Sequence, residues 1–179
     1  MRACRWRVEA PIEIPSRCVI IAAPHTSSWD FGFAIAACYV CGLDVHWMGK
    51  DALFPRPFAR LARWFGGIPV DRRQGHFAAT QVLRAFKHFD QFIVLIPPEG
   101  TRGPVTRWKR GFYNIARDAE VPIVCGYLDY GRKVAGFDHI FEPTGNFEED
   151  MAPVYRFYSS VTPRHPHNFV DLSAKSPEQ

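Results

Sequence analysis

Short apolar runs alternate with longer segments of helical character along this chain. Four runs have the composition of buried strands, at residues 18–22, 45–48, 92–96 and 121–130. Four longer segments have the spacing or composition of helices, at residues 30–43, 54–67, 76–89 and 109–120. A brief extended piece occupies residues 68–73. Because strands and helices alternate, the pattern predicts an α/β fold with a largely parallel or mixed sheet flanked by helices.

The C-terminal third departs from this alternation. Residues 132–143 have the pattern of a hairpin or a pair of short edge strands, and residues 146–160 that of a terminal helix, broken at Pro153. The remaining residues are rich in proline and polar side chains, which is typical of a loose tail. Since no repeat or linker interrupts the chain, we expect residues 1–179 to form a single domain.

The composition narrows the classes of partner. Hydrophobic residues make up 47% and charged residues 22% of the 179, which is a globular composition. The net charge of +4 favours anionic partners, such as phosphate groups, anionic lipids or nucleic acid. The basic residues gather at predicted strand ends and not along a sheet of base-stacking aromatic residues, so we expect no nucleic acid.

The cysteines and the apolar runs indicate the compartment. The number of cysteines, five, is odd and their spacing irregular, which favours free thiols in a reducing cytosol. Cys38 and Cys41 form a C-x-x-C, but they lie in an apolar helical segment and no second pair completes a zinc site, so we expect no metal. There is no signal peptide and no apolar stretch that could span a bilayer. We therefore expect a cytoplasmic protein whose membrane contact is peripheral, on the inner face.

The stretch PHTSSWDF, residues 24–31, holds a histidine five positions ahead of an aspartate. Within one helix the two side chains would point about 140° apart. If the helix begins at Thr26 or Ser27, however, His25 can fold back onto Asp30, and the carboxylate then makes the imidazole a general base. The alternative interpretation is purely structural: Ser27 caps the helix, Asp30 completes a capping box, and His25 takes no part.

Polar residues follow each of four predicted extended segments, at the edge of an α/β sheet where ligands bind. They are His25, Lys50, 71–73 and 99–102. No G-x-S-x-G elbow supplies a serine nucleophile, so a substrate hydroxyl is the expected nucleophile.

The segment PPEGTRG followed by WKRGF favours phosphate binding. Arg102, Lys109 and Arg110 lie beside a glycine turn, where Gly100 would allow backbone N–H groups to approach an anion. Glu99 is expected to pair with one of the cations or with a backbone donor of the active site. The alternative is an ordinary solvated basic loop.

Four blocks in this order resemble the glycerolipid acyltransferases, the family that includes 1-acylglycerol-3-phosphate acyltransferase. The blocks are HTSSWD at 25–30, GIPVDR at 67–72, PEGTR at 98–102 and VPIV at 121–124. Each block is weakly specific alone, but together they cover a motif core of about residues 18–128.

The resemblance implies a glycerol-3-phosphate acyltransferase-like fold and transfer of a fatty acyl group from acyl-CoA or acyl carrier protein to a lysophospholipid hydroxyl, most simply that of 1-acylglycerol-3-phosphate. It makes His25 the general base and Asp30 its orienting partner, with no metal or cofactor. It implies an acceptor phosphate site of Arg72, Glu99, Gly100, Thr101 and Arg102. Lys50 and Lys109 join this site only by the strand-end argument. Another lyso-lipid acceptor, or a non-catalytic lipid- or phosphate-binding module, is the alternative, although binding alone would need neither His25 nor Asp30.

The chain departs from the family pattern at three positions. Pro24 replaces the asparagine that often precedes the histidine, Pro97 the usual aromatic residue before PEGTR, and Gly103 the serine that commonly follows it. These differences leave the acceptor open.

The predicted helix at 54–67 has two faces. One carries the apolar residues Phe54, Phe58, Leu61 and Phe65, and the other carries Arg56, Arg60 and Arg63. Such a helix can lie in a membrane interface. It can equally pack its apolar face on the sheet of the protein itself, and this second interpretation is the one the sequence favours.

Overall fold

The computed structural model describes residues 5–50, 59–70 and 75–173. In this part of the chain seven strands form one sheet: β1 (Arg7–Glu9), β2 (Arg17–Ala23), β3 (Val45–Lys50), β4 (Gly67–Val70), β5 (Phe92–Ile96), β6 (Ile123–Asp129) and β7 (Val134–Phe141). The α-helices are α1 (Ser28–Val40), α2 (Ala59–Trp64), α3 (Gly75–His88), α4 (Gly111–Asp118) and α5 (Phe147–Ser159). A single 3₁₀ turn at Pro166–Asn168 follows α5.

The sheet is mostly parallel, with the strand order β1-β7-β6-β2-β5-β3-β4. Only the β6–β7 pair is antiparallel. Strand β2 is the central strand, and its Ile20 lies level with Leu95 of β5 and Val124 of β6. This arrangement confirms the predicted α/β class with a largely parallel sheet.

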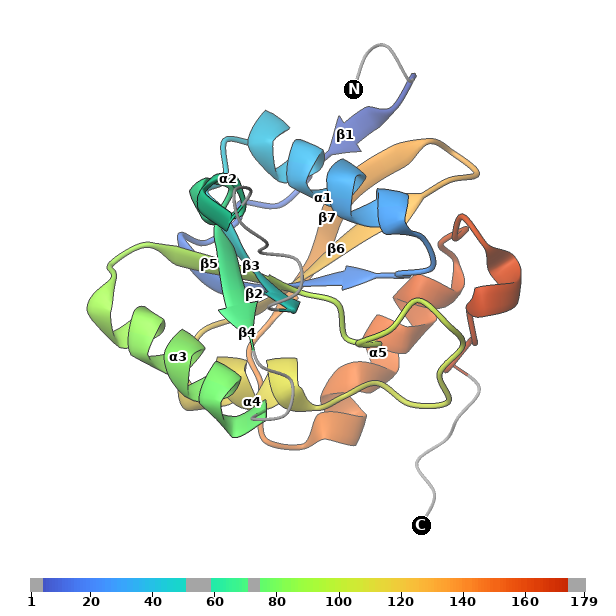
Figure 1. The fold of residues 1–179 in the computed structure, drawn as a ribbon. Coiled ribbons are helices and arrows are strands. Elements are labelled where there is room, and N and C mark those ends of the chain that lie inside the picture. The colour runs from blue at the N-terminus through green and yellow to red at the C-terminus, as the bar shows by residue number, and fades with distance from the viewer. Residues whose placement is uncertain (1–4, 51–58, 71–74, 174–179) are drawn as a thin grey trace.

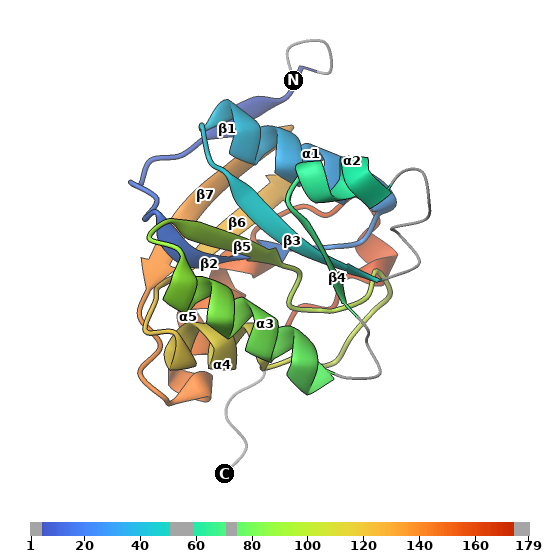
Figure 2. The ribbon, with the colours of Figure 1, turned by 60° about the vertical axis from the view of Figure 1, so that its left-hand side comes forward.

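Helices cover both faces of the sheet (Figures 1 and 2). On β2 the side chains alternate between these faces, as strand geometry requires. Val19 and Ile21 belong to the core formed with α3, α4 and α5, whereas Cys18 and Ile20 pack with residues of α1. Because all four side chains are fully buried, β2 is fixed between two apolar layers, and the residues that follow it start from a rigid position.

Most of the predicted elements are present, but the region at 132–143 is not a hairpin. It is one continuous strand, β7, and it does not lie at an edge because β1 pairs with its far side. A Cβ atom at Gly136 would lie 2.4 Å from the carbonyl oxygen of Glu9. The glycine therefore marks a close approach of two backbones and not a turn.

The C-terminal region also differs from the prediction. Helix α5 runs unbroken through Pro153, whose ring is exposed to solvent. The following segment is not loose up to residue 173, because Val161 and Leu172 are buried against the main core. Of the predicted helix at 54–67, residues 54–58 lie outside the described residues, and helix is present at Ala59–Trp64.

Candidate active site

The turn between β2 and α1 is organised by one carboxylate. Ser27 is the N-cap of α1, and its hydroxyl accepts a hydrogen bond from the backbone N–H of Trp29 (3.3 Å). Asp30 Oδ2 accepts hydrogen bonds from the backbone N–H groups of Ser27 (2.7 Å) and Thr26 (2.8 Å). This is a complete capping box, so the structural interpretation of the spacing is correct as far as Ser27 and Asp30 are concerned.

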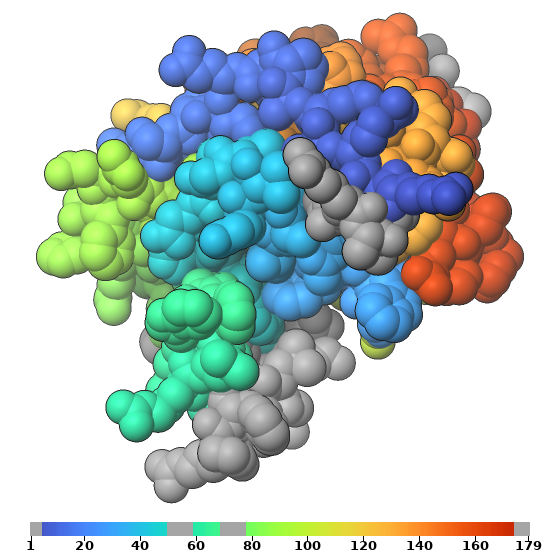
Figure 3. Space-filling view, turned by 90° about the horizontal axis from the view of Figure 1, so that it is seen from above, coloured from blue at the N-terminus to red at the C-terminus, as the bar shows by residue number. Residues whose placement is uncertain are grey.

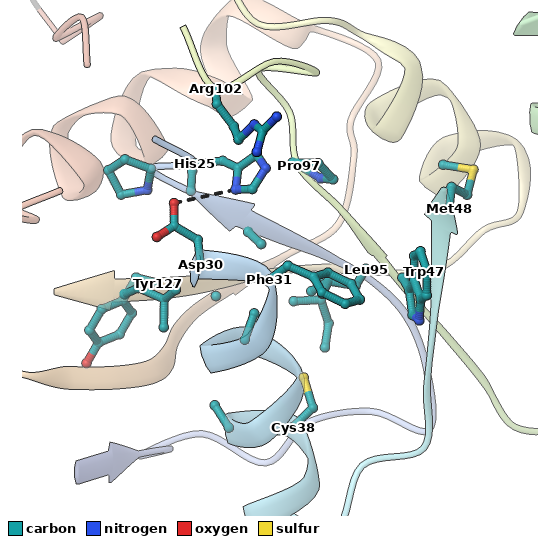
Figure 4. Close-up of a pocket in the computed structure, with 18 of the residues that line it drawn as sticks. His25, Asp30, Phe31, Cys38, Trp47, Met48, Leu95, Pro97, Arg102 and Tyr127 are labelled. Carbon is teal, nitrogen blue, oxygen red and sulfur yellow. Dashed lines mark ion pairs between the residues drawn. The ribbon is translucent and has the colours of Figure 1, made fainter. Parts of the chain in front are cut away.

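The same carboxylate also faces the histidine. Nδ1 of His25 lies 3.5 Å from Oδ2 of Asp30 (Figure 4). The cap and the histidine–carboxylate pair are therefore both present, because the carboxylate that caps α1 also faces His25. The Asp30 side chain is 4% exposed and that of His25 21%, so the imidazole lies between a buried anion and the solvent-accessible cavity.

Asp30 is held in its ionised form. Burial alone would raise its pKa, but contacts with His25, Tyr130 and the amides of Ser27 and Thr26 lower the pKa below the usual aspartate value. The Tyr130 hydroxyl donates to Asp30 Oδ1 at 2.7 Å. An ionised carboxylate beside Nδ1 favours the tautomer with the proton on Nδ1, which leaves Nε2 free to accept a proton.

Glu99 supports the backbone of the histidine. Its Oε1 accepts a hydrogen bond from the His25 N–H at 3.0 Å, which is one of the two pairings that the sequence suggested. Burial raises the pKa of Glu99 to about 7, and Oε2 is buried without a hydrogen-bond partner. The carboxyl group is therefore buried and turned toward the His25 backbone, and its place in the phosphate site stays a prediction.

The PEGTR block forms a tight turn next to this carboxyl group. Gly100 has φ of +66°, and its N–H donates to the Pro97 carbonyl at 3.2 Å. The amide of Gly100 itself is thus bonded within the turn, and the expected approach of an anion to backbone N–H groups at this glycine stays a prediction. The aliphatic part of Lys109 covers Gly100, where a Cβ atom would lie 2.9 Å from Lys109 Cε.

Arg102 and Thr101 are the exposed members of the block. The Arg102 guanidinium donates to the Ser28 hydroxyl at the start of α1. Thr101 Oγ1 accepts a long hydrogen bond of 3.4 Å from the Gly103 N–H. Arg102, Thr101 and His25 line the same cavity, so the structure brings the cation of the third block next to the histidine of the first.

For two of the predicted cations, the structure describes only the backbone or nothing. Lys50 is the last residue of β3, level with Val70 of β4, and its side chain lies outside the described part. Arg72 lies outside the described residues. Within the parts of the chain that the structure describes, no group of three or more His, Cys, Asp or Glu could hold a metal ion.

The cavity at this site has a volume of about 600 Å³ and lies between α1 and the sheet (Figure 4). His25, Asp30, Thr101 and Arg102 give it a polar end. The rest is mainly apolar and bordered by small residues, among them Ala22, Ala34, Ala37, Cys38, Gly126 and Gly136. Because these side chains are small, α1 leaves open space above the strands.

Helix α2 presents apolar side chains to solvent beside this cavity. Leu61, Trp64 and the following Phe65 are 53%, 77% and 51% exposed, so the favoured interpretation of a core-facing apolar face is wrong for Leu61 and Phe65. In Figure 3, α2 (green) projects at the surface next to α1 (light blue). The Phe65 carbonyl accepts from Trp47 Nε1 at 2.8 Å, and the Trp47 ring contacts Phe31 at 4.6 Å between centroids.

Trp47 and Phe31 both line the cavity, so the exposed apolar surface and the cavity are joined through these aromatic rings. Arg60 and Arg63 of α2 are exposed as well. Among the described helices, none is long and apolar enough to cross a bilayer.

The model of one protein family, described as "Acyltransferase", matches residues 5–128. The chain belongs to the acyltransferase family. Its fold is similar to the crystal structure of the 1-acyl-sn-glycerophosphate (LPA) acyltransferase PlsC from Thermotoga maritima. That match has a TM-score of 0.55 and 21% sequence identity, and it covers 84% of this chain and 67% of the other. No curated protein sequence matches the chain significantly.

The sequence analysis missed one residue of this candidate site. Tyr130 contacts Asp30, although it lies 100 positions further along the chain. The signal that could have found it is the strand-end argument, since Tyr130 directly follows β6, which pairs with β2 in parallel. Applied to this strand as well, the argument predicts a polar group at the same edge of the sheet.

Proposed function

We propose that this acyltransferase moves a fatty acyl group from an acyl thioester to the hydroxyl of a lysophospholipid, with 1-acylglycerol-3-phosphate as the leading acceptor. One observation carries the proposal: a single cavity joins the His25–Asp30 pair, the Arg102 cation and a long apolar lining. A lysophospholipid has the matching three parts, which are a hydroxyl, a phosphate and an acyl chain.

In the proposed reaction, His25 Nε2 takes the proton of the acceptor hydroxyl as the oxygen attacks the thioester carbonyl carbon. A C–O bond forms, and the negative charge moves onto the carbonyl oxygen. When the carbonyl is restored the C–S bond breaks, and the imidazolium returns the proton to the leaving thiolate. Asp30 stabilises the imidazolium between these steps. No acyl-enzyme is needed.

The acceptor phosphate is proposed to bind at Arg102 and Thr101, with Lys109, Lys50 and Arg72 as further candidates. A guanidinium suits a phosphate because its donors form a fork that matches two oxygens. Arg102 is anchored on the Ser28 hydroxyl, next to the positive end of the α1 dipole. The N-terminus of α1 therefore adds to the positive potential in which the phosphate would lie.

The apolar part of the cavity is proposed to hold an acyl chain. Ala34, Ala37 and Cys38 on α1 face Ala22 and Gly126 on the sheet across this space. Burial of methylene groups stabilises binding by about 0.8 kcal/mol each, so even a partly enclosed chain would add substantial affinity.

The protein is proposed to act at the cytoplasmic face of a membrane that carries anionic lipids. Leu61, Trp64 and Phe65 would enter the interface, while Arg60 and Arg63 meet lipid phosphates. Because Phe65 connects through Trp47 to the cavity, a lipid substrate would move from the bilayer to the base along an apolar path.

The test is an activity screen of the purified protein. Acyl-CoA and acyl carrier protein donors are paired with lysophosphatidic acid and with lysophospholipids of other head groups, and acylated product is measured by mass spectrometry. The proposal expects product with lysophosphatidic acid that disappears in His25→Ala. Product only with another head group would change the acceptor. Binding of lysolipids without turnover would favour the non-catalytic module instead.

A further inference from the structure

We infer that Tyr130 is a positioning residue of the His25–Asp30 pair, and that the segment after α5 holds it in place. The inference rests on the proposed function, because it assigns a role in the same proton transfer. It concerns residues beyond the matched range of the family model, which ends at residue 128.

The two oxygens of Asp30 have different partners. Oδ2 accepts from the backbone N–H groups at the start of α1 and faces Nδ1 of His25. Oδ1 accepts from the Tyr130 hydroxyl at 2.7 Å. A carboxylate bonded at both oxygens cannot rotate about its Cβ–Cγ bond without losing one set of bonds. The hydroxyl therefore fixes the plane of the carboxylate and with it the direction of the oxygen that faces Nδ1.

The Tyr130 ring is itself held from several sides. Trp6 contacts it edge-on at 4.9 Å between ring centroids, and Phe33 of α1 contacts it at 6.1 Å. The Arg164 guanidinium lies 5.6 Å from the ring centroid. The two aromatic contacts do not depend on the hydroxyl, so a phenylalanine at this position would keep them while leaving Oδ1 without this donor. The hydroxyl also interacts with Arg164, and that interaction would be lost with it.

The backbone after α5 ties Tyr130 to the catalytic turn. The N–H of Tyr130 donates to the Thr162 carbonyl at 2.9 Å. Three residues later, the N–H of His165 donates to Thr26 Oγ1 at 3.2 Å. One short segment therefore contacts both Tyr130 and the turn between His25 and Asp30, which explains why residues 162–165 are packed rather than loose.

The hydroxyl has two expected effects on the reaction. It keeps the pair aligned, so its loss should lower kcat about 10- to 100-fold, as expected for a hydrogen bond to a charged group. It also draws charge from Asp30, so without it the carboxylate would attract the imidazolium more strongly. The other charged groups near the pair are Glu99 and Arg102 beside His25, and Arg164 behind Tyr130. None of these residues is substituted in the variant, but Arg164 loses its interaction with the Tyr130 hydroxyl.

The experiment compares Tyr130→Phe with Tyr113→Phe. The control removes another tyrosine–aspartate hydrogen bond, from the Tyr113 hydroxyl to Asp150 Oδ2 at 2.6 Å, in the α4–α5 layer. We expect Tyr130→Phe to lower kcat at least tenfold with the KM of both substrates within about twofold, and to move the acidic limb of the kcat/KM profile to higher pH, by up to about one unit. Tyr113→Phe should change thermal stability only.

A second readout separates this inference from the proposed function. The pKa of His25 is measured by NMR titration, with its signal assigned through His25→Ala, and this requires no turnover. A rise in that pKa in Tyr130→Phe but not in Tyr113→Phe supports the inference even if the protein acylates no lysolipid. An unchanged His25 pKa, or wild-type kcat in Tyr130→Phe, overturns it.

Discussion

His25 Nδ1 lies 3.5 Å from Asp30 Oδ2 because α1 begins between the two residues. One carboxylate thus caps a helix and orients a base. A variant at Asp30 can therefore lose stability and activity for separate reasons, and the choice of substituent decides which effect is measured.

The variant Asp30→Asn should lower acyl transfer strongly while the protein stays folded. The amide oxygen of asparagine can still accept from the Ser27 and Thr26 N–H groups, but it carries no charge to stabilise the imidazolium.

The variant His25→Ala should lose about 10²- to 10⁴-fold in kcat, the usual contribution of a general base. Steady-state kinetics and a thermal melt check both. Wild-type turnover in His25→Ala would remove the proposed mechanism.

The variant Arg102→Ala should raise the KM for a phosphorylated acceptor at least tenfold and leave the KM for the acyl donor nearly unchanged, because a phosphate contact of about 1.5–3 kcal/mol is lost. The matched control is Arg117→Ala, an exposed arginine on α4 that pairs with Asp118. Equal effects on both substrates would place Arg102 outside the acceptor site.

The variant Glu99→Gln should change the pH dependence of stability. Burial raises the pKa of Glu99 to about 7 in the folded protein, so wild-type stability falls as pH rises from about 4.5 to 7 and the carboxyl group must ionise while buried. Glutamine does not ionise and can still accept from the His25 N–H.

Relative to wild type, the Glu99→Gln variant should therefore gain stability above pH 7, by up to about 3 kcal/mol, and this gain should shrink toward pH 5. Urea unfolding at pH 5 and pH 8 measures the difference. The exposed substitution Glu142→Gln is the control and should show no comparable trend. A gain that is the same at both pH values would mean that Glu99 does not titrate as inferred.

The variant Ala34→Leu should shorten the preferred acyl chain, because the added methyl groups project into the apolar part of the cavity. We expect kcat/KM to fall about tenfold for long-chain donors, about 1.4 kcal/mol, and little for short ones. Ala36→Leu lies on the same helix but does not line the cavity, so it serves as the control. An unchanged chain-length profile would place the acyl chain elsewhere.

The double variant Leu61→Ser/Trp64→Ser should release the protein from anionic liposomes without lowering its melting temperature, because both side chains are exposed. Arg60→Gln/Arg63→Gln should weaken binding most at low salt, since exposed charges are screened within about 10 Å at 0.1 M. Phe89→Ser, at an exposed position after α3, is the control. Unfolding of the double variant would show that this face is core, and continued pelleting would move the contact to another surface.

Local sequence patterns predicted the central layer well. The run at 92–96 is β5 to the residue, and the expectation that a helix begins near Ser27 placed His25 on Asp30. Both results depend only on neighbouring residues, namely a continuous apolar run and a capping box.

What the sequence could not supply was the direction of side chains whose partners are remote. Glu99 was grouped with the cations that follow it, but its carboxyl group faces the His25 backbone, 74 positions earlier. Residues 132–143 were interpreted as a hairpin or a pair of edge strands, but Gly136 in this segment packs closely against the backbone of β1, which lies at the other end of the chain. Only the pairing of strands across the sheet brings these residues together.

The buried cysteines have a practical consequence for assays. Cys18, Cys38 and Cys125 are buried, and burial raises the pKa of each thiol to about 12. Disulfide reagents react with thiolates, so these three side chains should not react in the native protein, whereas the CoA thiol freed from acyl-CoA reacts at once. Cys41 is only partly buried, so a reaction without substrate gives the background. In denaturant the same thiols become accessible. A single colorimetric thiol reagent can therefore follow turnover under native conditions and unfolding under denaturing conditions.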